Sequence, residues 1–143
     1  MVRNSWYKEE HKDDPFYPEY LGIVTQYVAE VNFPNVSKAV KDYQNRHTTM
    51  EKLSGKKFKY RQTTLEECSA ITGSEFNGVT PFNWGPEPST GRPIKIILSE
   101  ELLKNRPQRF YLGGGDQDTK IGISIDDFKR YHGHNLIITS IAK

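Results

Sequence analysis

The stretch that decides the fold class is residues 94–112, IKIILSEELLKNRPQRFYL. The apolar run at 94–98 predicts a strand, and Ser99, followed by two glutamates, caps a short helix that extends to residue 103. Residues 109–112 predict another strand, which runs directly into a glycine triplet. Strands connected in this way, without long crossover helices, favour a mixed sheet over a doubly wound parallel one.

The same pattern continues toward the C-terminus. Residues 120–123 and 136–141 predict two more strands, and residues 124–131 predict a helical turn between them. Strands therefore outnumber helices in this half of the chain.

Toward the N-terminus, residues 20–31 are rich in β-branched and aromatic side chains and predict a buried strand. Gly22 within it indicates a bulge or a close backbone approach. An apolar stripe at helical spacing follows, with Asn35 as the expected N-cap.

Residues 56–61 alternate between basic and aromatic side chains and predict a half-buried strand with a basic outer face. Thr63 and Glu66 have capping-box spacing for a short helix that Gly73 would end. We expect an α+β fold, with a mixed, curved or barrel-like sheet and a few short helices, forming a single domain over residues 1–143.

The composition limits the class of protein. The chain has 143 residues, a net charge of +2 and one cysteine, Cys68, which cannot form an internal disulfide. No apolar run approaches the roughly 20 residues that cross a bilayer, and the N-terminal residues lack the apolar segment of a secretory signal. These observations predict a cytoplasmic protein.

Four pieces of sequence, in order, carry a family resemblance. They are TLEECSAITG at 64–73, NGVTPF at 77–82, IKIILSEEL at 94–102, and YLGGG at 111–115 followed by ISIDDF at 123–128. This order resembles the C-terminal half of the YbaK/prolyl-tRNA-synthetase-associated domain. The family hydrolyses the ester of mischarged tRNA, including alanine or cysteine attached to tRNA for proline.

The resemblance implies a site and partners. Catalytic roles are expected for Gly78 and Thr80, and substrate contacts for the neighbouring loop and the glycine turn: Val79, Pro81, Phe82, Gly113, Gly114, Gly115 and Asp116. In the basic stretch, Lys57, Lys59 and Arg61 are expected to contact RNA. The partners would be the acceptor end of a mischarged tRNA and an aminoacyl-tRNA synthetase, with no metal and no cofactor.

The chain departs from the family at one point. Family members carry a lysine in an apolar strand ahead of the strand at 20–31, and Lys8 and Lys12 lie in a charged segment that does not match it. We expect that the N-terminal part of the family's domain is missing. A catalytically inactive tRNA- or protein-binding module and a small-molecule ester or amide hydrolase are therefore alternative functions.

Simpler interpretations of the same residues stay open. Gly78 and Pro81 also suit an ordinary surface turn, and Thr80 also suits the cap of its own turn. The glycine triplet also suits a plain turn, and it lacks the pattern of a phosphate-binding loop. The lysines at 56–59 also suit a solvated edge strand. Phe82 and Trp84 suit either the wall of an aminoacyl pocket or a core.

Overall fold

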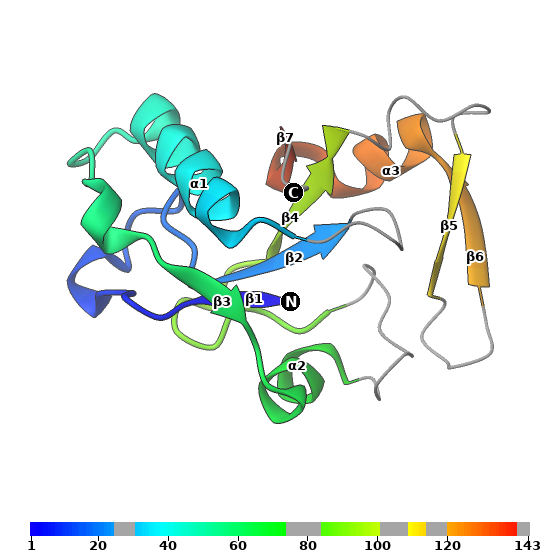
Figure 1. Ribbon diagram of the computed structural model, residues 1–143, viewed down its shortest axis with the longest axis horizontal. Helices are drawn as coiled ribbons and strands as arrows, with labels where there is room; N and C mark the ends of the chain where they lie inside the picture. Colours follow the sequence, from blue (N-terminus) through cyan, green and yellow to red (C-terminus); the bar gives the residue numbers. More distant parts are fainter. Residues whose placement is uncertain (25–30, 74–83, 101–108, 114–119, 140–143) are drawn as a thin grey trace.

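The computed structural model describes residues 1–24, 31–73, 84–100, 109–113 and 120–139. A five-stranded sheet with the order β3-β1-β2-β4-β7 forms its centre (Figure 1). In sheet order the strands are Tyr60–Gln62 (β3), Val2–Asn4 (β1), Tyr20–Val24 (β2), Lys95–Ser99 (β4) and Leu136–Thr139 (β7). The strand β1 is antiparallel to both of its neighbours, whereas β2, β4 and β7 run parallel.

The α+β class and the mixed sheet predicted from the sequence are confirmed. Within the described residues the sheet is open, because its two outer strands, β3 and β7, do not pair with each other. The strands Arg109–Gly113 (β5) and Lys120–Ser124 (β6) form a separate antiparallel hairpin beside helix Ile125–His132 (α3) (Figure 1).

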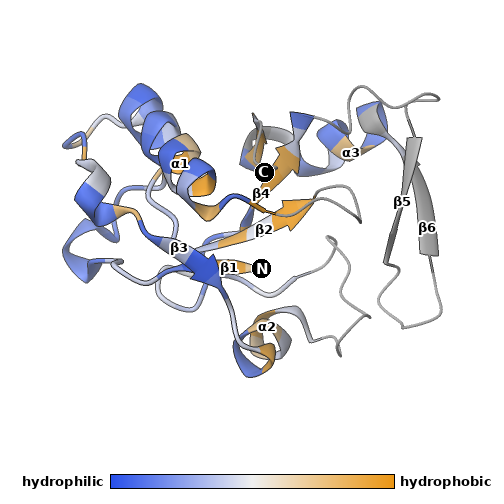
Figure 2. Ribbon diagram, in the orientation of Figure 1, coloured by the Kyte–Doolittle hydropathy of each residue, from blue (hydrophilic) through white to orange (hydrophobic). Residues whose placement is uncertain are grey.

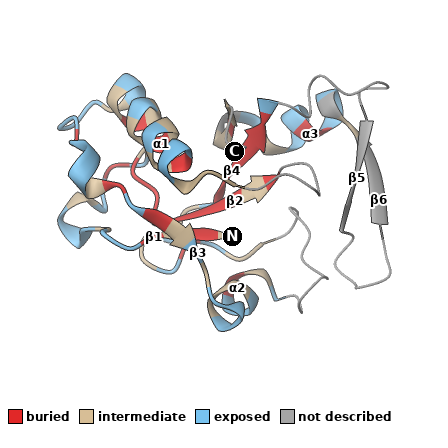
Figure 3. Ribbon diagram, in the orientation of Figure 1, coloured by how far each residue is buried: buried red, intermediate tan, exposed pale blue. Residues whose placement is uncertain are grey.

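Helix Phe33–His47 (α1) covers one face of the sheet. Val36 and Val40 are fully buried against Leu21 of β2 and Ile97 of β4. Apolar residues concentrate on β2 and β4 in Figure 2, and Figure 3 shows the same strands buried. Burial of this apolar stripe therefore holds α1 on the sheet.

The opposite face of β4 has its own apolar cluster. Ile96 and Leu98 pack there with Val24 of β2 and with Phe128 of α3. Side chains alternate along a strand, so Lys95 and Ile97 face α1 while Ile94, Ile96 and Leu98 face the other way.

Two predicted helix N-caps differ from those in the structure. The N-cap of α1 is Asn32 and not Asn35, because the Asn32 side chain accepts the backbone N–H of Asn35 at 3.2 Å. Helix Leu65–Thr72 (α2) has a capping box formed by Thr64 and Glu67, one residue later than predicted.

Two other expected features of the helices are confirmed. Gly73 ends α2 in the left-handed conformation at φ 70°. Ser124 caps α3 by accepting the backbone N–H of Asp127.

The predicted strand at 56–61 is only partly correct. Residues Gly55–Lys57 form a 3-10 turn (η2), and the strand β3 begins at Tyr60. Phe58 and Tyr60 do face inward, with exposed fractions of 5% and 3%. Hydrophobic alternation identified the inward side chains, but it did not identify the turn at Gly55.

None of the helices within the described residues is long and apolar enough to cross a membrane.

Candidate functional site

The expected catalytic loop lies outside the described residues, and with it Gly78, Val79, Thr80, Pro81 and Phe82. Its two flanks are described. The backbone N–H of Gly85 donates to the carbonyl of Ile71 in α2 at 2.9 Å. The chain therefore returns, at Gly85, to the helix that it left at Gly73.

Trp84 is the first described residue after that loop, and it packs against Gly22 of β2. A Cβ on Gly22 would overlap the indole ring of Trp84 and would lie 2.7 Å from Cδ1 of Ile96. The sequence predicted a bulge or a close backbone approach at Gly22, and the structure corrects this, because side chains are the groups that lie close to it. Gly22 therefore makes the space that Trp84 occupies.

Trp84 lines a cavity of about 370 Å³, which we call the Trp84 cavity. Ile96 of β4 and Ile94, which directly precedes this strand, line the cavity together with Tyr131 and His132 of α3. Pro93 and Asn135 complete the lining. The cavity is open to solvent and combines aromatic walls with a few polar groups, which is the usual character of a ligand site.

The indole Nε1 of Trp84 is buried and has no hydrogen-bond partner among the described residues. A buried donor without an acceptor is unfavourable by about 1–3 kcal/mol, so such groups are rare in folded proteins. A bound molecule with a carbonyl or hydroxyl oxygen would supply the missing acceptor.

The expected glycine turn is described only at its first residue. Gly113 is the last residue of β5 and pairs with Lys120 of β6. Gly114, Gly115 and Asp116 lie outside the described residues, as does the predicted helix after Ser99 beyond Glu100.

The three expected RNA-contacting residues lie in different surroundings. Lys59 is exposed, and its Nζ lies 5.7 Å from the ring centroid of Trp6, which is 50% exposed. Lys57 is half-buried in η2. Arg61 is ion-paired, since its Nη1 lies 3.2 Å from Oε1 of Glu67. Among the three, Lys59 is the exposed one.

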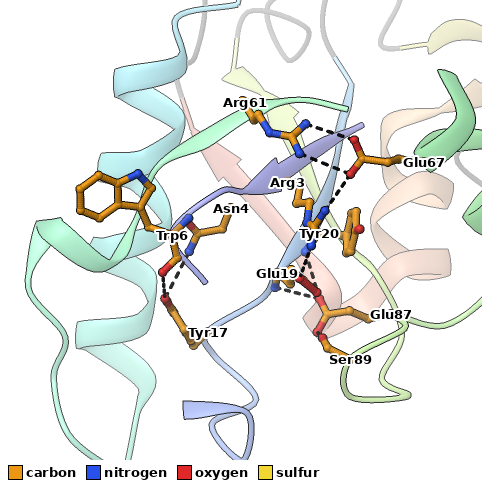
Figure 4. Close-up of polar contacts among 10 residues, drawn as sticks. All are labelled: Arg3, Asn4, Trp6, Tyr17, Glu19, Tyr20, Arg61, Glu67, Glu87 and Ser89. Atoms are coloured by element: carbon orange, nitrogen blue, oxygen red, sulfur yellow. Dashed lines mark hydrogen bonds and ion pairs between the residues drawn. The ribbon is translucent and has the colours of Figure 1, made fainter. Parts of the chain in front are cut away.

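Arg61 belongs to a charge network of five residues drawn in Figure 4: Arg3, Glu19, Arg61, Glu67 and Glu87. Arg3 donates to Glu67 at 3.1 Å and to Glu19 at 3.3 Å. Glu87 is buried and accepts the backbone N–H groups of Glu19 and Tyr20 at 2.9 and 3.1 Å. This network joins β1, β3, α2 and the loop after Trp84.

The pKa of the Glu67 carboxyl reflects these contacts. Burial alone would raise it, but the backbone N–H of Thr64 and the guanidinium groups of Arg61 and Arg3 lower the pKa to about 2. Glu67 is thus a structural carboxylate that stays ionised.

Lys95 is a candidate residue that the sequence patterns did not predict. It is the first residue of β4 and only 8% exposed, and it faces a second cavity, on the α1 side of the strand. The available signal was a lone lysine within the apolar run at 94–98. Within the described part of the chain, no three histidine, cysteine, aspartate or glutamate side chains gather in a group suited to a metal ion.

Comparisons with known proteins define the fold and nothing more. No family model matches the chain, and no curated protein is similar in sequence. One similar solved structure comes from epitope backbone grafting by computational design on scaffold proteins, with a TM-score of 0.62 and 12% identity. Another is the hypothetical protein APE2540, with a TM-score of 0.60 and 14% identity.

These two similarities cover 85% of this chain. The chain spans 61% of the length of the scaffold and 63% of the length of the hypothetical protein. At such low identity the likeness extends to the fold alone.

Proposed function

We propose that this chain is an aminoacyl-tRNA deacylase that hydrolyses the ester of mischarged tRNA and binds the acylated 3′ end at the Trp84 cavity. The proposal starts from the resemblance of residues 64–131 to the YbaK/prolyl-tRNA-synthetase-associated family. It places the terminal adenosine or the aminoacyl group against the indole of Trp84.

One observation carries this assignment. The hydrogen bond between Gly85 and Ile71 joins the two described flanks of the segment that contains Gly78 and Pro81, and Trp84 belongs to one of these flanks. The indole N–H of Trp84, which lines the cavity, is buried and has no partner among the described residues. A carbonyl or hydroxyl oxygen of an acylated ribose is the kind of acceptor that this N–H lacks.

The reaction requires little from side chains. A water oxygen adds to the ester carbonyl carbon, the bond to the ribose oxygen breaks, and that oxygen leaves with a proton. The products are a free amino acid and an intact tRNA. Backbone N–H groups of the loop at Gly78 are proposed to bind the developing oxyanion, and each such donor contributes about 100- to 1,000-fold in rate.

The basic residues supply the tRNA contact in this proposal. Lys59 is exposed and free to reach a phosphate, whereas the ion pair with Glu67 ties Arg61 to the fold. Affinity for tRNA should therefore fall with salt and depend more on Lys59 than on Arg61.

Deacylation of tRNA for proline charged with alanine tests the proposal, with Trp84→Phe and Trp6→Phe as a matched pair. Trp84→Phe removes the buried N–H but keeps an aromatic ring, and the rate should fall by about tenfold or more. Trp6→Phe makes the same chemical change at the exposed tryptophan and keeps a ring beneath Lys59, so the rate should stay at the wild-type value.

Gly78→Ala provides an independent test of the loop and should lower the rate by about 100-fold or more. If the wild-type chain leaves the ester intact but binds tRNA in a salt-sensitive way, it is a binding module and the proposal is wrong. If it cleaves free aminoacyl esters without binding tRNA, a small-molecule esterase is the correct assignment.

A further inference from the structure

A second cavity lies against the α1 face of β4, and we call it the Lys95 cavity. Lys95 begins β4 and pairs in register with Leu21 of the parallel strand β2. Asn135 directly precedes β7, the other neighbour of β4, so parallel pairing brings it beside Lys95. Three parallel strands thus begin at one edge of the sheet and fix the position of this lysine.

The ammonium of Lys95 has incomplete partners. Its Nζ donates to Oδ1 of Asn135 over 3.4 Å, which is long for a hydrogen bond. It also lies 5.9 Å from the ring centroid of Phe16 and 5.6 Å from that of Tyr43. Aromatic faces stabilise a cation, but they leave two of the three N–H donors without an acceptor among the described residues.

Burial lowers the pKa of Lys95. The carboxylate of Glu87 acts in the opposite direction and the guanidinium of Arg92 acts in the same direction as burial. Glu87 and Arg92 both lie near enough to Nζ to change the pKa of Lys95, and both line the same cavity.

Glu87 does not neutralise Lys95 by contact, because its oxygens already have donors. One oxygen accepts the backbone N–H groups of Glu19 and Tyr20, as described above. The other accepts the hydroxyl of Thr90 at 2.8 Å. Glu87 is held by the fold and is not free to turn to Nζ.

Arg92 carries a second charge that has no carboxylate within ion-pair distance among the described residues. Its Nη1 donates to the backbone carbonyls of Lys12 and Asp14 at 2.7 and 3.4 Å. These bonds hold the guanidinium at the wall of the cavity. Two cations and one carboxylate leave a local charge of +1.

Apart from Asn135 and Tyr17, the rest of the lining is apolar. Pro15, Phe16, Pro18 and Pro93 surround a volume of about 320 Å³. A complementary ligand therefore has one negative charge and an apolar body of a few carbon atoms. A phosphate dianion fits less well, because its second charge would meet Glu87 and its oxygens would face the prolines.

We infer that the Lys95 cavity binds a small organic carboxylate, with its carboxylate oxygens on Lys95 and Arg92 and its apolar body against Phe16 and the prolines. The site adjoins the proposed deacylase centre, since Pro93 and Asn135 line both cavities, but Lys95 and Arg92 line the Lys95 cavity and not the Trp84 cavity. Its occupancy does not depend on whether the chain hydrolyses an ester.

Isothermal titration with benzoate tests the inference, and benzamide is the neutral comparison because it has the same shape. Wild-type protein should bind benzoate at least about tenfold more tightly than benzamide, since only the anion forms charge-assisted hydrogen bonds. Equal affinities would overturn the inference, and so would inorganic phosphate binding in the absence of benzoate binding.

Variants locate the site. Lys95→Met keeps the length of the side chain without the charge and should weaken benzoate binding by at least about tenfold. Lys38→Met, at an exposed lysine of α1, should leave it unchanged. Arg92→Gln is a second variant in the cavity and should also weaken binding. Benzoate binding that both cavity variants retain at wild-type affinity would place the ligand elsewhere and overturn the inference.

Discussion

The charge network at β1, β3 and α2 and the two cavities along β4 differ in how most of their buried polar atoms are paired, although Nε of Arg3 in the network is also buried without a partner among the described residues. In the network, Glu67 contacts two arginines and two groups of Thr64, and Glu87 accepts two backbone N–H groups. Along β4, Nζ of Lys95 has one long hydrogen bond, and Nε1 of Trp84 has none among the described residues.

Under the two proposals, the chain supplies the partners of the polar groups in the network, and a ligand supplies those of Trp84 and Lys95. A buried polar atom whose partners come from the chain contributes to stability. A buried polar atom that faces a cavity without a partner is unfavourable in the free protein and becomes favourable when a ligand supplies one. Removing the charged group of Glu67 or of Lys95 should therefore change stability in opposite directions.

The largest change in stability is expected at Gly22 of β2, because the indole of Trp84 leaves no room for a side chain at this position. Gly22→Ala places a methyl group where the indole of Trp84 lies, and the free energy of unfolding should fall by about 2–3 kcal/mol. Urea unfolding followed by circular dichroism measures this change.

Gly55→Ala is the matched control for this substitution. A Cβ on Gly55 would meet only Cδ of Lys41, at 4.0 Å, so its effect should stay below about 1 kcal/mol. Equal losses at the two glycines would show that Trp84 is not packed against Gly22.

Within the charge network, Glu67→Gln should lower the free energy of unfolding at pH 7 by about 1–2 kcal/mol. The substitution leaves Arg3 and Arg61 without their shared partner and weakens the cap of α2. Parallel urea titrations of the two proteins provide the measurement.

The contribution of Glu67 to the free energy of unfolding should depend on pH in a defined direction. The pKa of Glu67 is lowered from 4.5 to about 2 in the folded protein. Its contribution to stability is therefore complete above pH 4.5 and is lost as the pH falls through about 2. The difference between wild type and Glu67→Gln should shrink over that interval, and a difference that grows in acid would contradict the assignment.

Lys95→Met should have the smallest effect on stability, and the opposite sign. It replaces a poorly paired buried ammonium with an apolar side chain of similar length, so the free energy of unfolding should rise by about 1 kcal/mol. A loss of stability comparable to that of Glu67→Gln would mean that Lys95 is a structural residue like those of the charge network.

The strands were the most predictable part of the fold. The apolar run at 94–98 and the alternation around Phe58 follow from burial alone, and the structure has both features. Cap positions shifted by one residue at Thr64 and by three at Asn32, because several hydrogen-bonding side chains near each helix start are chemically equivalent candidates.

The candidate site was less predictable. Gly22 signalled a close approach, but sequence spacing does not say which distant side chain fills the space, and that side chain is Trp84. The surroundings of Lys95 could not be predicted, because Phe16 and Tyr43, whose rings lie near its Nζ, are remote in sequence. The predicted residues of the loop at 78–82 and of the turn at 114–116 lie outside the described residues and stay predictions.

The central claim is that the Trp84 cavity receives the acylated end of a tRNA. The chain has only two tryptophans, so a ¹H–¹⁵N spectrum contains two indole N–H signals. We predict that a stable 3′-amide analogue of alanyl-adenosine shifts the Trp84 signal and leaves that of the exposed Trp6 in place. A spectrum in which the Trp84 signal does not move at saturating analogue would contradict the claim.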